Sequence, residues 1–389
     1  MEQQLTIGLD AKRIVRNGTG LGSYGRTLAN DLASIDGLNL RLYAPDGGRS
    51  ELRTQVPERD NLHFVYPTSS PLSSLPSPLS SLYKAYWRSH GILHQLMADG
   101  VQLFHGLSGE LPLGIRKTGI RSVVTIHDLI FMRHPEYYNW TDVQIYRKKF
   151  FRTLREADRI VAISECTRRD IAQLGRIPEE HISLIYQSCA PRFTTQVSPS
   201  DAEQVSRTYG LPRRYLLGVG TIEQRKNMML ALKALHWLPD DISLVLVGRA
   251  TKYARQIAET ATKENLTHRL RLLHGVPDQH LPALYAGAEV FVYPSRYEGF
   301  GIPVIEAIRM GLPVVACTGS CLEEAGGPDS LYVGPDDAEA MASAIQQMLK
   351  GADGRAQRIE RSQYYIRRFE NADAARQFAE LYASLLKCH

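Results

Sequence analysis

The sequence predicts an α/β protein made of two doubly wound parallel sheets. Three observations support this fold class: short apolar runs rich in β-branched residues alternate with longer amphipathic segments, the strand-like runs are apolar along their whole length, and the alternation lapses once near the middle. Strands of this kind are typical of parallel sheets that helices cover on both faces. With 389 residues, 43% of them apolar, the chain is long enough for two domains of ordinary size.

Strand-like runs occur in both halves of the chain. In the first half they are LTIGLDA, NLRLYAP, LHFVYP, VQLFHGL, SVVTIHD, RIVAIS and ISLIYQ; in the second half they are RRYLLGVGT, ISLVLVG, RLRLLHG, VFVYPS, LPVVACT and SLYVG. Most are separated by segments with helical periodicity, for example residues 22–34, 226–236 and 303–310. Each half therefore predicts one sheet whose strands are joined by helices.

The boundary between the two domains is expected near residues 189–206, where Pro, Ser, Thr and Gln replace both periodic patterns. Residues 1–190 would form the first domain and residues 191–365 the second. The final segment, residues 361–387, has helical periodicity in two pieces. From about residue 366 to 389 it is expected to cross back to the first domain.

Residues 67–91, PTSSPLSSLPSPLSSLYKAYWRSHG, break the alternation. Their serines and prolines predict a loop, although the leucines and aromatic residues make it more apolar than most loops. A loop longer than about 12 to 15 residues inside a compact domain is usually functional or disordered. We expect this one to help bind a substrate, and the pattern leaves open whether it contacts an acceptor or a membrane.

The composition argues against several classes of protein. A net charge of +5 is small for this length and is not a nucleic-acid-binding signature. Five scattered cysteines without a Cys-x-x-Cys pair indicate neither a disulfide framework nor a zinc site, so we expect buried or incidental thiols. No run of 18 uncharged apolar residues occurs and no apolar signal core precedes the first strand, so a cytoplasmic location is expected.

Most of the positive charge lies in the first half, where residues 1–190 contain 23 Lys and Arg against 19 Asp and Glu. A large part of it lies in YRKKFFRTLREADR, residues 146–159, which has helical periodicity with Phe150, Phe151 and Leu154 on one side. Such a helix is most often a solvated face packed on a sheet. The functional alternative is attraction to an anionic lipid surface, with the protein peripheral on the inner face of the cytoplasmic membrane.

The stretch VYPSRYEGFGIPVIEA, residues 292–307, combines a strand end, a glycine-rich loop and a helix start. Pro303 suits the first helical position, and a helix N-terminus at the carboxyl end of a parallel strand presents free N–H groups to an anion. Gly299 and Gly301 would let the backbone approach closely. The loop is therefore predicted to hold phosphate.

Two glutamates flank this loop. Glu306 is expected in the first turn of the helix, where the dipole stabilises a carboxylate that can accept both hydroxyls of a ribose. Glu298 stands at the loop entrance, nearer to whatever the phosphates carry. Either glutamate alone could be an ordinary acidic residue at a helix start, but this explanation fits the pair less well because Glu298 precedes the helix.

A second candidate site is LLGVGTIEQRKNMMLALKAL, residues 216–235, in which Arg225 and Lys226 stand between a strand and a helix. Two cations at such a junction can neutralise a diphosphate. Without the glutamate loop, solvated charges near a helix start would be the preferred explanation.

Two further motifs belong to the first half. His127 and Asp128 close the apolar strand of VVTIHDLIF at an edge expected to face a cleft, although a lone histidine at a strand end is more often structural. RNGTGLGSYGRTLANDL places Gly18, Gly20 and Gly22 before a helix. As a nucleotide fingerprint this glycine pattern is weak, but it suits close approach to a phosphate or an acceptor.

Together these motifs resemble glycosyltransferase family 4, whose members are retaining enzymes of the GT-B fold, with two Rossmann-like domains facing a central cleft. EGFGIPVIE is similar to the Glu-x7-Glu signature of that family, and the other motifs follow in the family's order over nearly the whole chain. HGLSGELPLGI and GTIEQRKN look most like a bacterial mannosyltransferase-like subgroup.

The resemblance implies roles for the residues of the second half. Glu306 would bind the nucleotide ribose, and Lys226 matches the family's diphosphate-binding lysine. The contact to the donor sugar and phosphates would come from Glu298 and from the backbone of Gly299, Phe300 and Gly301.

Other positions are implied by the same resemblance. His127 resembles the histidine that contacts the transferred sugar, and Gly20 and Gly22 match a glycine loop near the phosphates. Val276, within HGVPDQH, would lie along the donor base. Many relatives carry an arginine where Thr221 stands here, so Arg225 would supply the second positive charge.

The implied reaction transfers a hexose, mannose first, from GDP-mannose or a UDP-sugar to a hydroxyl of an oligosaccharide or lipid-linked glycan during cell-surface polysaccharide synthesis, with retention. No cofactor or metal is expected, since the sequence has no Asp-x-Asp triplet. Lys226, Arg225 and the helix N-terminus at Pro303 would stabilise the leaving diphosphate. The family is thought to react on one face of the sugar, so no general base is assigned.

Three other classes compete with this interpretation. A two-domain dehydrogenase would share the layered pattern but needs a dinucleotide fingerprint after its first strand. A glycosidase could use two carboxylates, but it would have no use for Arg225 and Lys226. A non-catalytic sugar-nucleotide-binding or scaffold protein would share every motif, and turnover of a labelled nucleotide sugar would distinguish it.

Overall fold

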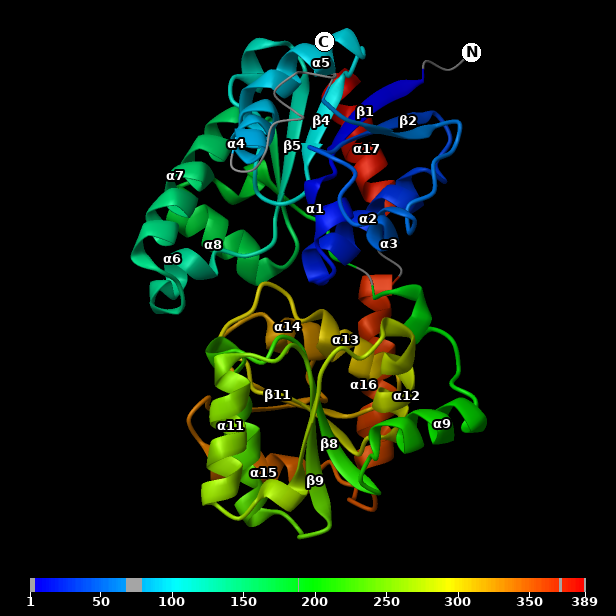
Figure 1. The fold of residues 1–389 in the computed structure, drawn as a ribbon, viewed down its shortest axis with the longest axis vertical. Helices are drawn as coiled ribbons and strands as arrows, with labels where there is room; N and C mark the ends of the chain where they lie inside the picture. The colour runs from blue at the N-terminus through cyan, green and yellow to red at the C-terminus, as the bar shows by residue number, and fades with distance from the viewer. Residues whose placement is uncertain (1–3, 68–78, 188, 371–372, 388–389) are drawn as a thin grey trace. The chain divides into compact units, whose positions relative to one another are not determined.

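A computed structural model of the protein describes residues 4–67, 79–187, 189–370 and 373–387. The chain divides into two compact units (Figure 1): residues up to Gln187 with those from Ala372 onward, and residues Ser188–Asn371. The predicted boundary at residue 190 is close to this division. The return to the first unit falls between the last two helices, whereas it was expected at about residue 366, inside the first of them.

The first unit contains a sheet of seven parallel strands in the order β3-β2-β1-β4-β5-β6-β7. The strands are β1 (Leu5–Asp10), β2 (Leu38–Tyr43), β3 (Leu62–Val65), β4 (Leu103–Gly106), β5 (Arg121–Ile126), β6 (Arg159–Ala162) and β7 (Ile182–Leu184). The chain runs outward from β1 on one side and outward from β4 on the other. The order therefore reverses between β1 and β4, which is where doubly wound sheets bind ligands.

Helices cover both faces of this sheet (Figure 1). They are α1 (Lys12–Arg16), α2 (Gly20–Leu32), α3 (Ser50–Arg53), α4 (Leu79–Tyr86), α5 (Ile92–Ala98), α6 (Ile130–Arg133), α7 (Trp140–Glu156), α8 (Glu165–Gly175) and α17 (Ala374–Lys387). Neighbouring residues of β4 point to opposite faces: Leu103 joins a core with Phe378 of α17, and Phe104 joins a second core with Trp87 and Phe150. The prediction of strands buried on both faces is confirmed.

The segment predicted as a loop over residues 67–91 is helical from Leu79 onward, because α4 continues through a π-helical turn, η2 (Trp87–Gly91), into α5. Residues 68–78 of that prediction lie outside the described residues. Serine favours caps and turns over helix interiors, which is why the composition concealed the helix. Trp87 is buried and anchors the turn to the core.

The second unit contains six parallel strands in the order β10-β9-β8-β11-β12-β13. They are β8 (Arg214–Val219), β9 (Ile242–Val247), β10 (Leu270–Leu273), β11 (Val290–Tyr293), β12 (Val314–Cys317) and β13 (Leu331–Val333). Here the order reverses between β8 and β11. The two sheets therefore share one plan, with the reversal next to the first strand of each.

The helices of the second unit are α9 (Pro199–Tyr209), α10 (Met228–Ala234), α11 (Lys252–Lys263), α12 (Leu281–Gly287), α13 (Ile302–Arg309), α14 (Leu322–Gly326), α15 (Ala338–Gln346) and α16 (Arg355–Glu370). Helix α9 occupies much of the stretch 189–206, which was expected to be irregular. Its N-terminus is defined by Ser198, whose side chain accepts a hydrogen bond from the backbone N–H of Asp201, and by Pro199 at the first helical position.

Within the portions of the chain given above, every helix is too short or too polar to cross a lipid bilayer.

Candidate active site

The candidate site of the second unit lies where its strand order reverses. The loops that follow β8 and β11 leave the same edge of the sheet, because these two strands are parallel neighbours. The backbone N–H of Arg296 in the second loop donates to the carbonyl of Arg225 in the first at 2.9 Å. Residues 71 positions apart in the sequence are thus brought into contact.

Glu298 and the two predicted cations form one buried cluster in these loops. Lys226 Nζ donates to Glu298 Oε1, and Arg225 Nη1 is 3.0 Å from Glu298 Oε2, so both carboxylate oxygens are paired. Lys226 also donates to the hydroxyl of Tyr293 at 2.6 Å, and Arg225 is paired with Glu223 at 2.8 Å. Lys226 and Glu298 are both less than 10% exposed.

These contacts fix the protonation states of the cluster. Burial opposes ionisation of Glu298, but the charges of Lys226 and Arg225 outweigh it and lower the pKa of the carboxyl to about 2. Burial likewise opposes the charge on Lys226, and Glu298 reverses this effect so that the lysine pKa is raised. The site therefore holds a carboxylate and two cations at neutral pH.

The conformation of the glycine-rich loop is stabilised by residues that pack against it. The Cys321 thiol donates to the carbonyls of Glu298 at 3.2 Å and Phe300 at 2.8 Å. The Phe300 ring packs edge-on against Phe369 of α16, with centroids 5.2 Å apart, which anchors the loop to that helix. Gly301 has a φ of 110°, and a Cβ there would lie 3.0 Å from Leu322, so only glycine suits this position.

Glu306 is placed differently from the prediction. Helix α13 begins at Ile302, Pro303 is its second residue, and the first turn contains no acidic residue. Glu306 is the fifth residue, buried, and its Oε2 accepts a hydrogen bond of 3.0 Å from the hydroxyl of Tyr285. The expectation that Glu306 lies in the first turn of the helix is therefore wrong. Burial raises the pKa of Glu306 to about 7 despite that hydrogen bond.

The other predicted donor contacts lie on the same edge of the second sheet. Thr221 follows Gly220, whose φ of 139° turns the chain out of β8, and is half-buried. Gly299 of the glycine loop is also half-buried. Val276 follows β10 in a loop where the ring of His274 is hydrogen-bonded to the carbonyl of Gly248 at 2.6 Å.

His127 belongs to the first unit, directly after β5. Its Nδ1 accepts from the side-chain amide of Gln187 at 2.9 Å, which leaves Nε2 to donate to the carbonyl of Leu107 at 2.8 Å. Burial lowers the pKa of His127 to about 4, so the ring is neutral at pH 7. Both nitrogens are occupied by the chain itself, and a sugar hydroxyl would have to replace one of these partners.

A buried polar chain continues from this histidine to the last helix. Tyr24 packs edge-on against His127, with centroids 4.8 Å apart, and its hydroxyl is 3.3 Å from Thr125 Oγ1. The two ring nitrogens of His105 have different partners: Nε2 lies 2.8 Å from Thr125 Oγ1, and Nδ1 lies 2.6 Å from the hydroxyl of Tyr382 in α17. Burial lowers the pKa of His105 to about 3, so this link is uncharged.

Of the three glycines predicted to precede a helix, Gly18 does precede it, whereas Gly20 and Gly22 lie inside it. Gly20 is the first and Gly22 the third residue of α2. A Cβ on Gly22 would lie 1.7 Å from the carbonyl oxygen of Asn17, whereas one on Gly20 would meet nothing within 4 Å. Gly22 is thus required by packing, and Gly20 leaves an open approach to the helix start.

The structure therefore brings together Arg225, Lys226 and Glu298, and places Glu306 on the helix that follows their loop. Sequence reasoning missed Tyr293, Tyr285 and Cys321. Tyr293 could have been found, because it ends the same strand that leads to Glu298. The cysteines were expected to be buried or incidental: the four described ones are buried and free, but Cys321 supports the loop.

The raised pKa of Glu306 predicts a stability change in Glu306→Gln. The folded pKa of about 7 exceeds the ordinary 4.5, so the wild-type free energy of unfolding falls as pH rises from 4.5 to 7. Glutamine cannot ionise, so the variant avoids this loss of free energy, and its side-chain oxygen can still accept a hydrogen bond from the hydroxyl of Tyr285. Urea unfolding at pH 8 should show the variant more stable by up to roughly 3 kcal/mol, with no gain at pH 4. Equal gains at both pH values, or a gain in the exposed control Glu259→Gln, would contradict the assignment.

The cluster around Glu298 predicts a strong coupling between Lys226 and that carboxylate. Lys226→Met should lower the free energy of unfolding by about 3 to 5 kcal/mol, because it leaves a buried charge with one cation fewer. Adding Glu298→Gln should recover most of the loss. Urea unfolding of both variants and of the exposed control Lys263→Met measures the coupling; a single variant as stable as the wild type would refute it.

Comparison with known proteins identifies the two units. Residues 18–189 match the family described as Glycosyltransferase Family 4, and residues 202–364 match Glycosyl transferases group 1. The O-antigen chain mannosyltransferase B of Escherichia coli is 34% identical over 64% of this chain and 65% of its own length. The O-antigen chain mannosyltransferase RfbU of Salmonella typhimurium is 30% identical over the same shares.

The chain thus matches about two thirds of the length of these curated relatives. A crystal structure of a glycosyltransferase from Rickettsia africae ESF-5 has a TM-score of 0.77, 17% identity and complete coverage of both chains. This likeness and the two parallel sheets confirm the predicted GT-B fold class. The chain belongs to the glycosyltransferases that combine a family 4 domain with a group 1 domain.

Proposed function

We propose that this protein transfers a hexose, with retention of configuration, from a nucleoside diphosphate sugar to a hydroxyl of a glycan acceptor. The observation that carries the proposal is the buried cluster of Lys226, Arg225 and Glu298 beside the N-terminus of α13. Two cations at the end of a parallel strand suit a diphosphate, and Glu298 suits the hydroxyls of the sugar attached to it.

In this proposal the leaving group is stabilised by the chain itself. Negative charge develops on the diphosphate as the bond to the sugar breaks, and Lys226 and Arg225 are fixed before that step. Helix α13 has eight residues, and its first N–H groups add a partial positive charge. These groups support a reaction that needs neither a metal ion nor another cofactor.

The two glutamates are not proposed as an acid and a base. Glu298 has both oxygens in ion pairs and a pKa of about 2, so it is not a proton donor near neutrality and is a weak nucleophile, while its remaining lone pairs can accept hydrogen bonds from sugar hydroxyls. Glu306 accepts from Tyr285 and is proposed to accept the ribose hydroxyls once ionised. This division of roles supports reaction on one face of the sugar over the double displacement of a retaining glycosidase.

The names of the relatives support a donor and an acceptor. Two of them are described as O-antigen chain mannosyltransferases, so mannose is the proposed sugar, GDP-mannose the first donor to test, and a lipid-linked glycan the proposed acceptor. UDP-sugars are the alternative donors. A protein that binds such donors without turnover is the competing function, since binding alone would need the same cluster.

Donor turnover is the test of this function. GDP-mannose is expected to be hydrolysed slowly and to raise the Tm more than UDP-glucose, UDP-galactose or UDP-N-acetylglucosamine. Glu298→Gln and Lys226→Ala should each lower turnover by roughly 100-fold or more. Lys226→Ala removes a cation that stabilises the negative charge of the transition state, and Glu298→Gln removes the carboxylate that holds both cations in position and is proposed to contact the sugar. Lys263→Ala is the matched control. Near-full turnover in both variants would overturn the site, and binding without turnover for every donor would favour the competing function.

We also propose that α7 contacts an anionic membrane surface. Phe150 on one side of the helix is buried in the core, while Trp140 is 75% and Ile145 50% exposed on its outward side, together with exposed Arg147 and Lys148. Aromatic and basic residues on one exposed surface suit the headgroup region of a bilayer. A location on the inner face of the cytoplasmic membrane would follow from such contact.

Vesicle cosedimentation tests this surface. Binding to vesicles containing anionic phospholipid at low salt should fall at least several-fold in Arg147→Glu/Lys148→Glu, since each basic residue near such a surface contributes about 1 kcal/mol. The matched control is Arg255→Glu/Lys263→Glu on α11, which changes the same charge in the second unit. No binding by the wild type, or equal loss in both variants, would refute the proposal.

A further inference from the structure

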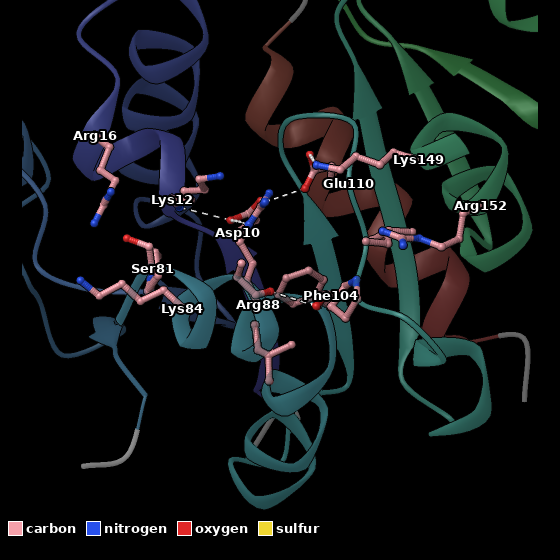
Figure 2. Close-up of a pocket in the computed structure, with 16 residues that line it drawn as sticks. Asp10, Lys12, Arg16, Ser81, Lys84, Arg88, Phe104, Glu110, Lys149 and Arg152 are labelled. Carbon is pink, nitrogen blue, oxygen red and sulfur yellow. Dashed lines mark hydrogen bonds and ion pairs between the residues drawn. The ribbon is translucent and has the colours of Figure 1, made fainter. Parts of the chain in front are cut away.

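The first unit has a cavity of about 440 Å³ where its own strand order reverses (Figure 2). Asp10 at the end of β1 and Phe104 in β4 line it from the sheet, and Glu110 lines it from the segment after β4. The remaining walls come from α1, the α4–η2 segment and α7. The cavity thus occupies the position at which doubly wound sheets bind ligands, in the unit that does not contain Glu298.

Basic side chains dominate the lining. Two acidic residues, Asp10 and Glu110, face six basic ones, namely Lys12, Arg16, Lys84, Arg88, Lys149 and Arg152. Asp46 also pairs with Arg16 and with Lys84, in the latter case at 2.8 Å. Even with Asp46 included, the basic groups exceed the acidic ones by three.

The acidic residues hold some of these cations in place. Arg88 donates to Asp10 at 2.7 Å and also to Glu110, which accepts a further hydrogen bond of 2.9 Å from Lys149. Burial opposes the charge of Glu110, but Arg88 and Lys149 outweigh it and lower its pKa to about 2. Arg88 and Lys149 are therefore held in position by Asp10 and Glu110 before any ligand binds.

Two cations in the lining have no such partner. Among the described residues, neither the Lys12 ammonium nor the Arg152 guanidinium makes a side-chain hydrogen bond or salt bridge, and Arg152 Nε is buried without an acceptor. Burial and the nearby charge of Arg88 lower the pKa of Lys12, and the charges of Glu110 and Asp10 only partly oppose this effect. The cavity is thus left with positive charge that its own acidic groups do not neutralise.

We propose that this cavity binds a phosphate or diphosphate group of the acceptor, with Lys12 and Arg152 as its direct contacts. Arginine and lysine on several sides of a concave site suit a group with many acceptor oxygens, and the fixed Arg88 and Lys149 add to the attraction. A neutral glycan would leave the surplus charge unpaired. This proposal rests on the proposed function only where it identifies the ligand as the glycan acceptor; the binding of a phosphate group by the cavity does not depend on it.

Direct binding of inorganic pyrophosphate to the full chain is the first test. The second unit is expected to bind the same probe, so titration calorimetry is done in a Lys226→Met/Glu298→Gln background. There, Lys12→Ala/Arg152→Ala should weaken binding at least tenfold. Lys148→Ala/Arg155→Ala, which removes one lysine and one arginine from exposed positions of α7, should change it less than twofold. Affinity should also fall steeply as salt is raised to roughly 0.5 M.

A second set of probes separates the sources of the phosphate. Tighter binding of farnesyl diphosphate than of pyrophosphate would indicate a lipid-linked diphosphate, and tighter binding of glucose 1-phosphate a soluble sugar phosphate. Binding of glucose or glucuronate with none of pyrophosphate would overturn the proposal. So would equal pyrophosphate binding in the Lys12/Arg152 variant and its control.

Three further measurements distinguish a loss of anion binding from misfolding of a variant and from failure of the proposed function. Thermal unfolding checks that the variants fold. Arg152→Lys, which keeps the charge, should bind pyrophosphate within about threefold of the parent. If Arg152→Lys binds as weakly as the alanine variant, the loss of binding is structural and the proposal fails. Binding of a nucleoside diphosphate sugar by Lys12→Ala/Arg152→Ala in the otherwise native chain should be unchanged. If no donor binds even the wild type, the proposed function fails while the anion site can still stand.

Discussion

A buried carboxylate stays ionised only when cations lie close to it. In this protein the carboxylate of Glu298 therefore determines how the loops at one edge of the second sheet are arranged. Its two oxygens are paired with Lys226 and Arg225, so the loop after β8 and the loop after β11 are held against one another by charge. Because Glu223 is paired with Arg225 as well, the cluster is close to neutral overall. In the proposed function, an incoming diphosphate would take over contacts that already exist, because the positions of the cations are set by Glu298 and Glu223.

The two sheets follow one plan with different charge balances. In each, the strand order reverses beside the first strand, and loops from the two adjoining strands carry a carboxylate that fixes cations: Glu298 in the second unit and Glu110 in the first. The cluster around Glu298 is nearly balanced, whereas the cavity of the first unit keeps an excess of positive charge. The same topology thus gives a site in the second unit whose charges are balanced within the chain, and a site in the first unit whose excess positive charge is proposed to be balanced by a bound anion.

The pattern of strands and helices was readable from the sequence because parallel strands buried on both faces must be apolar throughout. Glu298 and Lys226 could be chosen from their motifs, but their contact depends on β8 lying next to β11, and strand order leaves no local trace in a sequence. Glu306 was misplaced for two reasons. The helix starts one residue earlier than Pro303 suggested, and Tyr285, its buried partner, comes from another helix. The cavity with Lys12 and Arg152 was missed because its walls come from five segments that are separated in the sequence.

The closing helix α17 has a consequence for how the protein is made. Phe378 and Tyr382 are fully buried in the core between α2 and the first sheet, and Tyr382 is hydrogen-bonded to His105. During synthesis the first 187 residues emerge without the helix that fills this core, while residues 188–371 can complete their own sheet. Although domains generally fold in N-terminal order on the ribosome, here the first domain to emerge is the last able to finish folding.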